Sequence, residues 1–208
     1  MKEREAIGMK VRFWKQHSME SCGAACVLMI LDAFGVDYPT IGKEHALYQR
    51  YRAKCTPGML GGSAALALVR HGLDVTLAHA EAEMMVNREG YYPPELFEGI
   101  LGEHREAVLQ AGDALRLRLG EPVTAQWLRS ELARERLIIA EILVPGDADG
   151  MHDHVLHGVL LYGVQEDEFL LCDPLRGKCR MPEAELISAM NTPVGAMAIS
   201  AGCKSALL

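Results

Sequence analysis

The sequence predicts an α+β fold, in which early helices pack against a mainly antiparallel sheet built largely from later strands. Three observations support this prediction. Helical patterns occupy most of residues 22–133, strand patterns dominate after residue 137, and two of the later strands are separated by a short polar turn. Runs of helices followed by runs of strands are typical of α+β domains.

Length and composition are those of one globular domain, which we expect to span residues 1–208. The chain is long enough to close a sizeable core, half of its residues are apolar and 24% are charged. The charged N-terminal stretch lacks an apolar signal segment, and no run approaches the roughly 20 apolar residues of a membrane helix. We therefore expect a cytoplasmic protein without a membrane segment.

The net charge of −7 argues against nucleic acid as a partner, because phosphate binding needs clustered lysine and arginine. The six cysteines are expected to be reduced thiols, since the chain shows no export signal. None of them forms a Cys-x-x-Cys motif, so the zinc signal is weak and we expect no cofactor. The sequence carries no signal for an oligomeric state.

The first strong element is a helix over residues 22–34. Its apolar residues occupy nearly every side, which is typical of a central, buried helix, and Gly35 is a natural stop. Before it, residues 11–14 alternate enough to predict a short strand that delivers Gln16 toward the start of the helix.

Residues 40–122 are predicted to be a largely helical elaboration of the fold. Thr40 can cap a helix that runs toward Cys55, and Ser63 can cap the next helix, after which residues 73–77 alternate like a strand.

The later part of this elaboration, residues 80–122, is acidic and amphipathic. Pro93 and Pro94 open a long helical pattern in it. We interpret the segment as a lid or flap whose charges form a solvated face rather than a binding patch.

The last third of the chain predicts most of the sheet. Thr124 can cap one more helix, and residues 137–144 form an apolar, branched strand of the kind found in the middle of a sheet. The remaining strands and the last helix are predicted at residues 155–164, 168–172, 182–190 and 194–200.

Cys22 is the candidate nucleophile. It is predicted in the first turn of a buried helix, where the positive end of the peptide dipoles and unpaired N–H groups favour a thiolate. A thiolate that attacks a carbonyl needs a base, a group that orients the base and a donor for the oxyanion.

The predicted hairpin around residues 165–167 supplies a candidate base and orienting group. If the turn centres on Gln165, His157 faces Asp173 directly, and if it centres on Glu166, the two are diagonal neighbours on the same face. An aspartate beside an imidazole can hold its tautomer and stabilise the imidazolium.

The motifs resemble those of the papain-like double-glycine leader peptidases, which process bacteriocin precursors. In that family a glutamine stands six residues before Cys-Gly-x-Ala-Cys, as Gln16 stands before Cys22. A histidine then opens a His-x-Val-x-x-x-Gly strand, and Asp-Pro follows about sixteen residues later, as His157 and Asp173 do. Because the elaborated middle lengthens the interval between cysteine and histidine and no exporter domain is present, the chain looks more like stand-alone bacterial members of this superfamily.

The resemblance implies a papain-like peptidase fold and a role for each of four residues. Cys22 would be the nucleophile, His157 the general base and then acid, Asp173 the orienting group, and Gln16 an oxyanion donor beside the Cys22 backbone N–H. It also implies a peptide or protein substrate that is cut after small residues such as Gly-Gly.

Several alternatives stay open. The same residues could serve an acyl or amide transferase, or the scaffold could be a peptide-binding domain without catalysis. His154 could replace His157 as the base in another register. The cluster of His152, Asp153, His154 and His157 could suggest a metal, although no complete ligand set is evident. Cys26 could be a resolving thiol or a small buried apolar residue.

Overall fold

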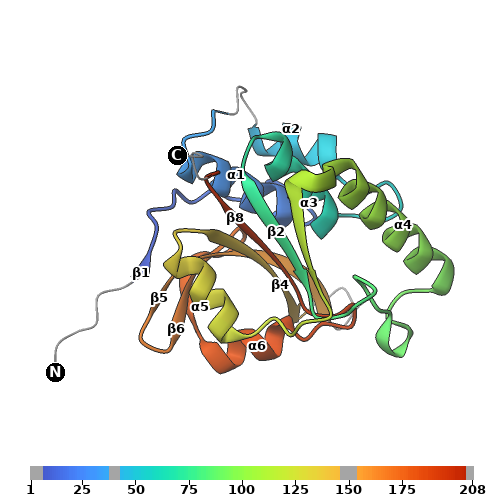
Figure 1. Ribbon diagram of the computed structural model, residues 1–208. Coiled ribbons are helices and arrows are strands. Elements are labelled where there is room, and N and C mark those ends of the chain that lie inside the picture. The colour runs from blue at the N-terminus through green and yellow to red at the C-terminus, as the bar shows by residue number, and fades with distance from the viewer. Residues whose placement is uncertain (1–6, 38–42, 146–153, 205–208) are drawn as a thin grey trace.

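Every strand of the described residues belongs to one sheet, and helices cover both faces of it (Figure 1). The structure is a computed structural model that describes residues 7–37, 43–145 and 154–204. The helices are α1 (Cys22–Ala33), α2 (Lys43–Tyr51), α3 (Gly61–Arg70), α4 (Pro94–Ala111), α5 (Ala125–Ala133) and α6 (Glu183–Met190). The strands are β1 (Ile7–Gly8), β2 (Asp74–His79), β3 (Leu115–Leu119), β4 (Leu137–Pro145), β5 (His154–Gln165), β6 (Glu168–Asp173), β7 (Gly177–Pro182) and β8 (Met197–Gly202).

The strands follow the order β3-β2-β8-β4-β5-β6-β7, and β1 pairs with β5 beyond the end of β4. Only β2 and β3 run parallel, so the sheet is mainly antiparallel as predicted. β4 lies between β8 and β5, which confirms the mid-sheet position that its branched, apolar sequence predicts.

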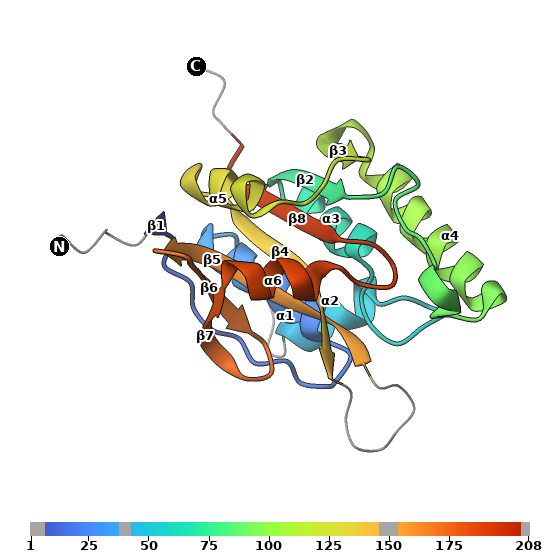
Figure 2. The same cartoon turned by 90° about the horizontal axis from the view of Figure 1, so that it is seen from below.

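Two apolar clusters join the helices to the sheet. The larger cluster packs α1, α2, α3 and α4 on one face, and the smaller one packs α5 and α6 on the other (Figure 2). Residues 23–31 of α1 are all buried, so the prediction of a central helix is confirmed. Burial of apolar surface on this scale is the main stabilising contribution to such a fold.

Several predicted boundaries are confirmed. The Thr124 hydroxyl accepts a hydrogen bond from Trp127 N at 3.2 Å and caps α5. The hairpin of β5 and β6 turns at Glu166 and Asp167, and its last residue pair joins Gln165 to Glu168. The proposed cap at Thr40 lies outside the described residues.

The predicted strand at residues 11–14 is wrong, because this stretch is irregular and the place beside β5 is taken by β1. Ser63 is not a cap either. α3 begins earlier, at Gly61, because Gly62 lets it approach α4 closely: a Cβ at Gly62 would lie 2.7 Å from His104 O.

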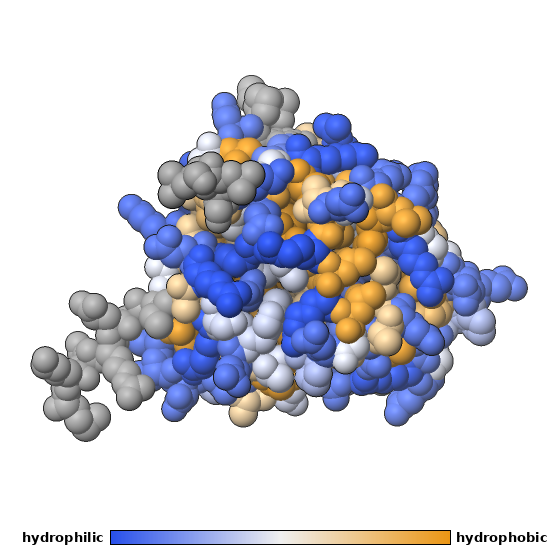
Figure 3. All heavy atoms as spheres, in the orientation of Figure 1, coloured by the Kyte–Doolittle hydropathy of each residue, from blue (hydrophilic) through white to orange (hydrophobic). Residues whose placement is uncertain are grey.

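The sequence did not predict β3 or β7, both of which are edge strands. β3 has the sequence Leu-Arg-Leu-Arg-Leu, and its arginines lie on the face away from α3 and α4, where Arg116 is exposed and Arg118 is half-buried. Arg116 bonds Asp74 and Thr76 of β2, which attaches the edge strand to the sheet. In Figure 3 apolar side chains gather over β3 and the adjoining part of α4, where Leu117 and Leu109 are exposed.

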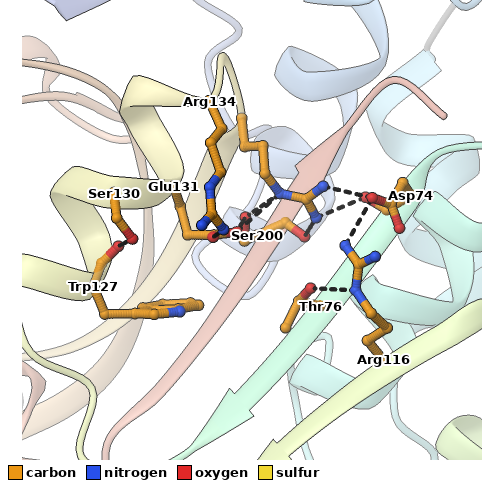
Figure 4. A network of polar contacts seen from close by, with 9 residues as sticks. Asp74, Thr76, Arg116, Trp127, Ser130, Glu131, Arg134 and Ser200 are labelled. Atoms are coloured by element: carbon orange, nitrogen blue, oxygen red, sulfur yellow. Dashed lines mark hydrogen bonds and ion pairs between the residues drawn. The ribbon is translucent and has the colours of Figure 1, made fainter. Parts of the chain in front are cut away.

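A buried polar network joins α5 to the sheet. It includes Glu131 of α5, Ser200 of β8 and Asp74 of β2 (Figure 4). Arg136 is buried; its Nη1 donates to Asp74 Oδ2 at 2.7 Å and its Nε to Ser200 Oγ at 2.8 Å. The Ser200 hydroxyl donates to Glu131 Oε2 at 2.6 Å, and Arg136 Nε lies 2.9 Å from the same oxygen. Burial alone would raise the pKa of Asp74, but its bonds to Arg136 and Arg116 outweigh burial and lower it.

A second buried polar feature is a pair of histidines between β2 and α4. Gly62 N donates to His104 Nδ1 at 3.1 Å, so neutral His104 carries its proton on Nε2, which lies 3.1 Å from His79 Nε2. Burial, aided by repulsion between the two rings and by Arg105, lowers the pKa of His79 to about 3 and that of His104 to about 4.

No helix of the described residues is long and apolar enough to span a membrane. All six cysteines are free thiols.

Replacing Arg136 with leucine is expected to lower the free energy of unfolding by about 3 to 5 kcal/mol, because the buried Glu131 carboxylate loses its buried counter-charge and Asp74 keeps only Arg116. Urea denaturation measures the change. The matched control is Arg134→Leu, whose side chain is 71% exposed and contacts Glu131 Oε1, and which should cost less than about 1 kcal/mol. Equal losses for the two variants would contradict the assignment.

The histidine pair should make the fold sensitive to acid. Both pKa values are lower in the folded chain than in the unfolded one, so stability is present above about pH 6.5 and is lost as the pH falls below it. The expected slope is about 1.4 kcal/mol per pH unit for each proton taken up. NMR titration should show both rings neutral at pH 5, with the urea-unfolded chain as reference; a folded midpoint near 6.5 for either ring would refute this.

Candidate active site

Cys22 is the first residue of α1, and this end of the helix lies where the β5–β6 ladder stops. The last residue pair of that ladder joins Leu160 to Cys172. Two residues further along β5, Gly158 N donates to Cys22 Sγ at 3.4 Å, and Gly158 O accepts from Cys26 Sγ at 3.5 Å. Cys22 and Cys26, one helical turn apart, therefore hydrogen-bond to β5 at the point where β6 no longer pairs with it.

The start of α1 packs closely on its surroundings. On the side of β5, a Cβ at Gly158 would lie in ordinary contact with Cys22 Sγ, at 3.7 Å. On the other side of the helix start, a Cβ at Gly23 would lie 3.1 Å from Met59 Cβ. The position of the thiol is thus fixed by main-chain contacts rather than by long, flexible side chains.

His157 and Asp173 share one face of the hairpin because β5 contains a bulge. At Tyr162 the register of β5 against β6 shifts by one residue. Without the shift, Asp173 would lie opposite Leu160, and His157 would point to the other face. With the shift, Asp173 falls opposite Val159, and His157 is its diagonal neighbour on the same face. This is the diagonal arrangement that the sequence allowed.

β1 packs against this bulge. Met9 N donates to Tyr162 O at 2.9 Å, and a Cβ at Gly8 would lie only 2.8 Å from the same oxygen. A residue other than glycine would therefore push β1 away from the bulge.

His157 and Asp173 form a buried pair, with Nε2 of the ring 2.9 Å from Oδ1 of the carboxylate. The backbone N–H groups of Leu175 and Arg176 donate to the same oxygen at 2.8 and 3.3 Å. The Cys22 thiol is close enough to the ring to raise its pKa. With Nε2 facing Asp173, Nδ1 is the ring nitrogen left for Cys22.

Electrostatics favour a protonated His157. Burial alone would lower the pKa of the ring, but its bonds to Asp173 and Cys22 and the negative charge on both outweigh burial and raise it to about 9. Burial alone would raise the pKa of Asp173, but the bond from His157 and the two backbone donors lower it. At neutral pH the pair is expected to hold an imidazolium beside a carboxylate.

Gln16 is buried beside this pair and its backbone N donates to Pro174 O at 3.1 Å. Its side-chain Nε2 donates to Ser18 O at 2.8 Å and to Met19 O at 3.2 Å, so it braces the loop that leads to Cys22. Its Oε1 is buried without a hydrogen-bond partner among the described residues. To donate to an oxyanion, the amide would have to give up one of the two carbonyls.

A cavity of about 680 Å³ opens beside the same loop. His17, Ser18 and Glu20 line one side of it, and Arg52 and Lys54 from the segment after α2 line another. A chain passing Cys22 could extend into this space.

Glu141 lies on β4 directly opposite Gly158, on the face that α1 covers. Burial raises the pKa of its carboxyl to about 7. Neither Glu141 nor Gly158 was a candidate site residue from the sequence. One signal was present, because Glu141 is the only charged residue in the apolar run 137–144.

The other sequence candidates lie apart from this geometry. His154 is exposed at the start of β5, and its carbonyl accepts a hydrogen bond from Tyr91 Oη at 3.1 Å. His152 lies outside the described residues. Among the described residues, no group of three histidine, cysteine or acidic side chains could hold a metal. Burial, with the negative charges of Cys22 and its other neighbours, raises the pKa of Cys26, as expected of a small buried residue rather than a reactive thiol.

No protein-family model matches the chain, and no curated protein sequence matches it. Several solved structures, however, are similar to the structure of this chain. A C39-like peptidase from Bacillus anthracis aligns with a TM-score of 0.59 at 13% identity, covering 98% of this chain and all of that one.

Two further structures are similar over nearly the whole chain. A double-glycine motif protease from an AMS/PCAT transporter, solved with its leader peptide, has a TM-score of 0.50 at 14% identity and covers 97% of this chain and all of that one. The peptidase domain of Streptococcus ComA, a bifunctional ABC transporter in quorum sensing, has a TM-score of 0.50 at 13% identity and covers 94% of this chain and 99% of that one.

These likenesses confirm the predicted fold. The chain has the α+β, papain-like fold of double-glycine peptidases, and it has that fold over almost its full length.

Replacing Asp173 with asparagine should lower the pKa of His157 from about 9 by about one to three units, because the ring loses its buried counter-charge. NMR titration of the ring measures it. Asp167→Asn, at the exposed turn of the same hairpin, is the matched control and should leave the midpoint unchanged. A midpoint in Asp173→Asn equal to that of the control would show that the pair does not hold the ring's proton.

Proposed function

We propose that this protein is a papain-like cysteine peptidase that cleaves a peptide or protein through Cys22, His157, Asp173 and Gln16. The observation that carries the proposal is the meeting of three groups at the end of the β5–β6 ladder. Cys22 Sγ accepts the N–H of Gly158 at 3.4 Å, and the preceding residue of β5, His157, has its Nε2 2.9 Å from Asp173 Oδ1. A thiol, a base and an orienting carboxylate in this order suit acyl transfer.

In the first step, the Cys22 sulfur attacks the carbonyl carbon of the scissile bond and its proton resides on His157. A C–S bond forms and the carbonyl electrons move onto oxygen. The oxyanion lies near the first N–H groups of α1, which lack intrahelical partners, and the amide of Gln16 would add a donor. The tetrahedral intermediate collapses as the C–N bond breaks, and His157 gives its proton to the leaving amine.

In the second step, water replaces the amine. His157 takes a proton from water as it attacks the thioester, the C–S bond breaks, and the product leaves as an acid. Asp173 holds the ring in place in both steps because its oxygen is itself fixed by two backbone donors.

We further propose that the substrate carries small residues such as Gly-Gly before the cut and that cleavage occurs in the cytoplasm. Support comes from the solved double-glycine protease that binds a leader peptide.

Cys22→Ala should abolish cleavage of fluorogenic peptides that end in Gly-Gly, a loss of at least about 10⁴-fold in kcat/KM, because the nucleophile is gone. Cys203→Ala removes an exposed thiol at the end of β8 and should keep full activity. Cleavage by Cys22→Ala at a rate close to that of the control would exclude the proposed mechanism.

Gln16→Ala should lower kcat for peptide cleavage by about 10² to 10³, because an oxyanion donor is lost. The same change removes the brace on Ser18 and Met19, so a second measurement separates the two effects. Alkylation of Cys22 by iodoacetamide forms no oxyanion and should keep at least about half its rate. A parallel fall of both rates would assign Gln16 to positioning the loop instead.

A further inference from the structure

Glu141 places a carboxylate in an otherwise apolar strand beside the proposed nucleophile. We propose that Glu141 forms a subsite of the substrate cleft that binds a positively charged side chain, arginine or lysine, close to the scissile bond. This inference rests on the peptidase function proposed above, since it names a property of the substrate of the same site.

The register of the sheet places Glu141 next to Cys22. Glu141 pairs with Gly158 across β4 and β5, and paired residues of this kind have Cβ positions about 4.5 to 5.5 Å apart. Because a Cβ at Gly158 would lie 3.7 Å from Cys22 Sγ, the Cβ of Glu141 lies within about 9 Å of the sulfur.

Among the described residues, Glu141 has no partner of its own. The other acids near the centre of the sheet, Asp74 and Glu131, each pair with Arg136, whereas no ion pair or hydrogen bond joins Glu141 to any described residue. A half-buried carboxylate without a counter-charge is unfavourable, and a cationic ligand would relieve that cost.

The surroundings of Glu141 suit a guanidinium or an ammonium. Tyr91 and Tyr92, from the segment before α4, lie near it, with their rings in a T-shaped contact at 4.8 Å. Burial and the charge of Glu141 raise the pKa of both hydroxyls, so they stay neutral. Aromatic faces attract cations, and Leu156 packs beside them. Burial raises the pKa of Glu141 to about 7, so the carboxyl changes charge in the neutral range.

Two matched electrophiles test the subsite without requiring peptide cleavage. The chloroacetamide of agmatine carries a guanidinium and that of pentylamine is neutral, and both alkylate Cys22. At pH 8 we expect the wild-type protein to react about tenfold faster with the cationic reagent, the effect of one charge-assisted contact. In Glu141→Gln the ratio should fall to about one, and in Glu185→Gln, an exposed residue of α6, it should be unchanged.

The pH dependence of this ratio adds an independent readout. Titration of Cys22 and His157 affects both reagents equally and cancels, so the ratio should rise from pH 6 to pH 8 as Glu141 loses its proton. The rate with the neutral reagent reports whether each variant keeps an intact site. A wild-type ratio near one at pH 8, or a preference that survives Glu141→Gln, would overturn the subsite.

The outcomes also separate the subsite from the peptidase function. Peptides in which arginine is moved through each position flanking the cut should show one favoured position, and Glu141→Gln should remove that preference while cleavage of neutral peptides continues. Cleavage with no arginine preference at any position would reject the subsite alone. Failure of every peptide to be cleaved, with the alkylation ratio intact, would reject the peptidase function alone.

Discussion

The active-site geometry depends on which groups form hydrogen bonds with the backbone N–H and C=O of one residue, Gly158. The β5–β6 ladder stops two residues short of Gly158, and the first turn of α1 takes the place of β6 there, so that Cys22 accepts the N–H of Gly158 and Cys26 donates to its C=O. Buried backbone groups almost always find partners, and this requirement holds the thiol beside the strand that carries His157. The nucleophile and base are therefore held together by the architecture of the sheet.

A second constraint, the bulge at Tyr162, sets the face on which His157 lies. The sequence predicts a hairpin with both His157 and Asp173 in reach, because a polar turn lies between two apolar strands. It could not predict the bulge, against which Gly8, far away in the sequence, packs closely at Tyr162. The long helices and buried strands were predictable from hydrophobic periodicity. The edge strands were missed for different reasons: β7 has no apolar alternation of its own, whereas Leu115–Leu119 of β3 alternates strictly but lies at the end of a segment interpreted as an amphipathic lid.

Charge distribution divides the site into two parts. Asp173 and Cys22 hold a proton on His157, whereas Glu141, on the face of the sheet that α1 covers, has no counter-charge among the described residues. The sequence motif indicated the first part, because its residues carry the chemistry of a known family. The second part follows only from register, since strand pairing alone brings Glu141 opposite Gly158. For Gln16 the sequence motif indicated the location but not the contacts. The residue lies beside Pro174, which suits an oxyanion donor, but its side-chain amide donates to the carbonyls of Ser18 and Met19 in the loop before Cys22.

The central claim is that Cys22, held against Gly158, forms a covalent acyl intermediate. Rapid acid quenching during turnover of a Gly-Gly peptide ester, followed by mass spectrometry of proteolytic fragments, measures this directly. We expect a thioester on the fragment that contains Cys22, which disappears in water at the rate at which free acid is released. An acyl group on another residue, or product formed at full rate with no adduct on Cys22 and no slowing in Asp173→Asn, would contradict the account.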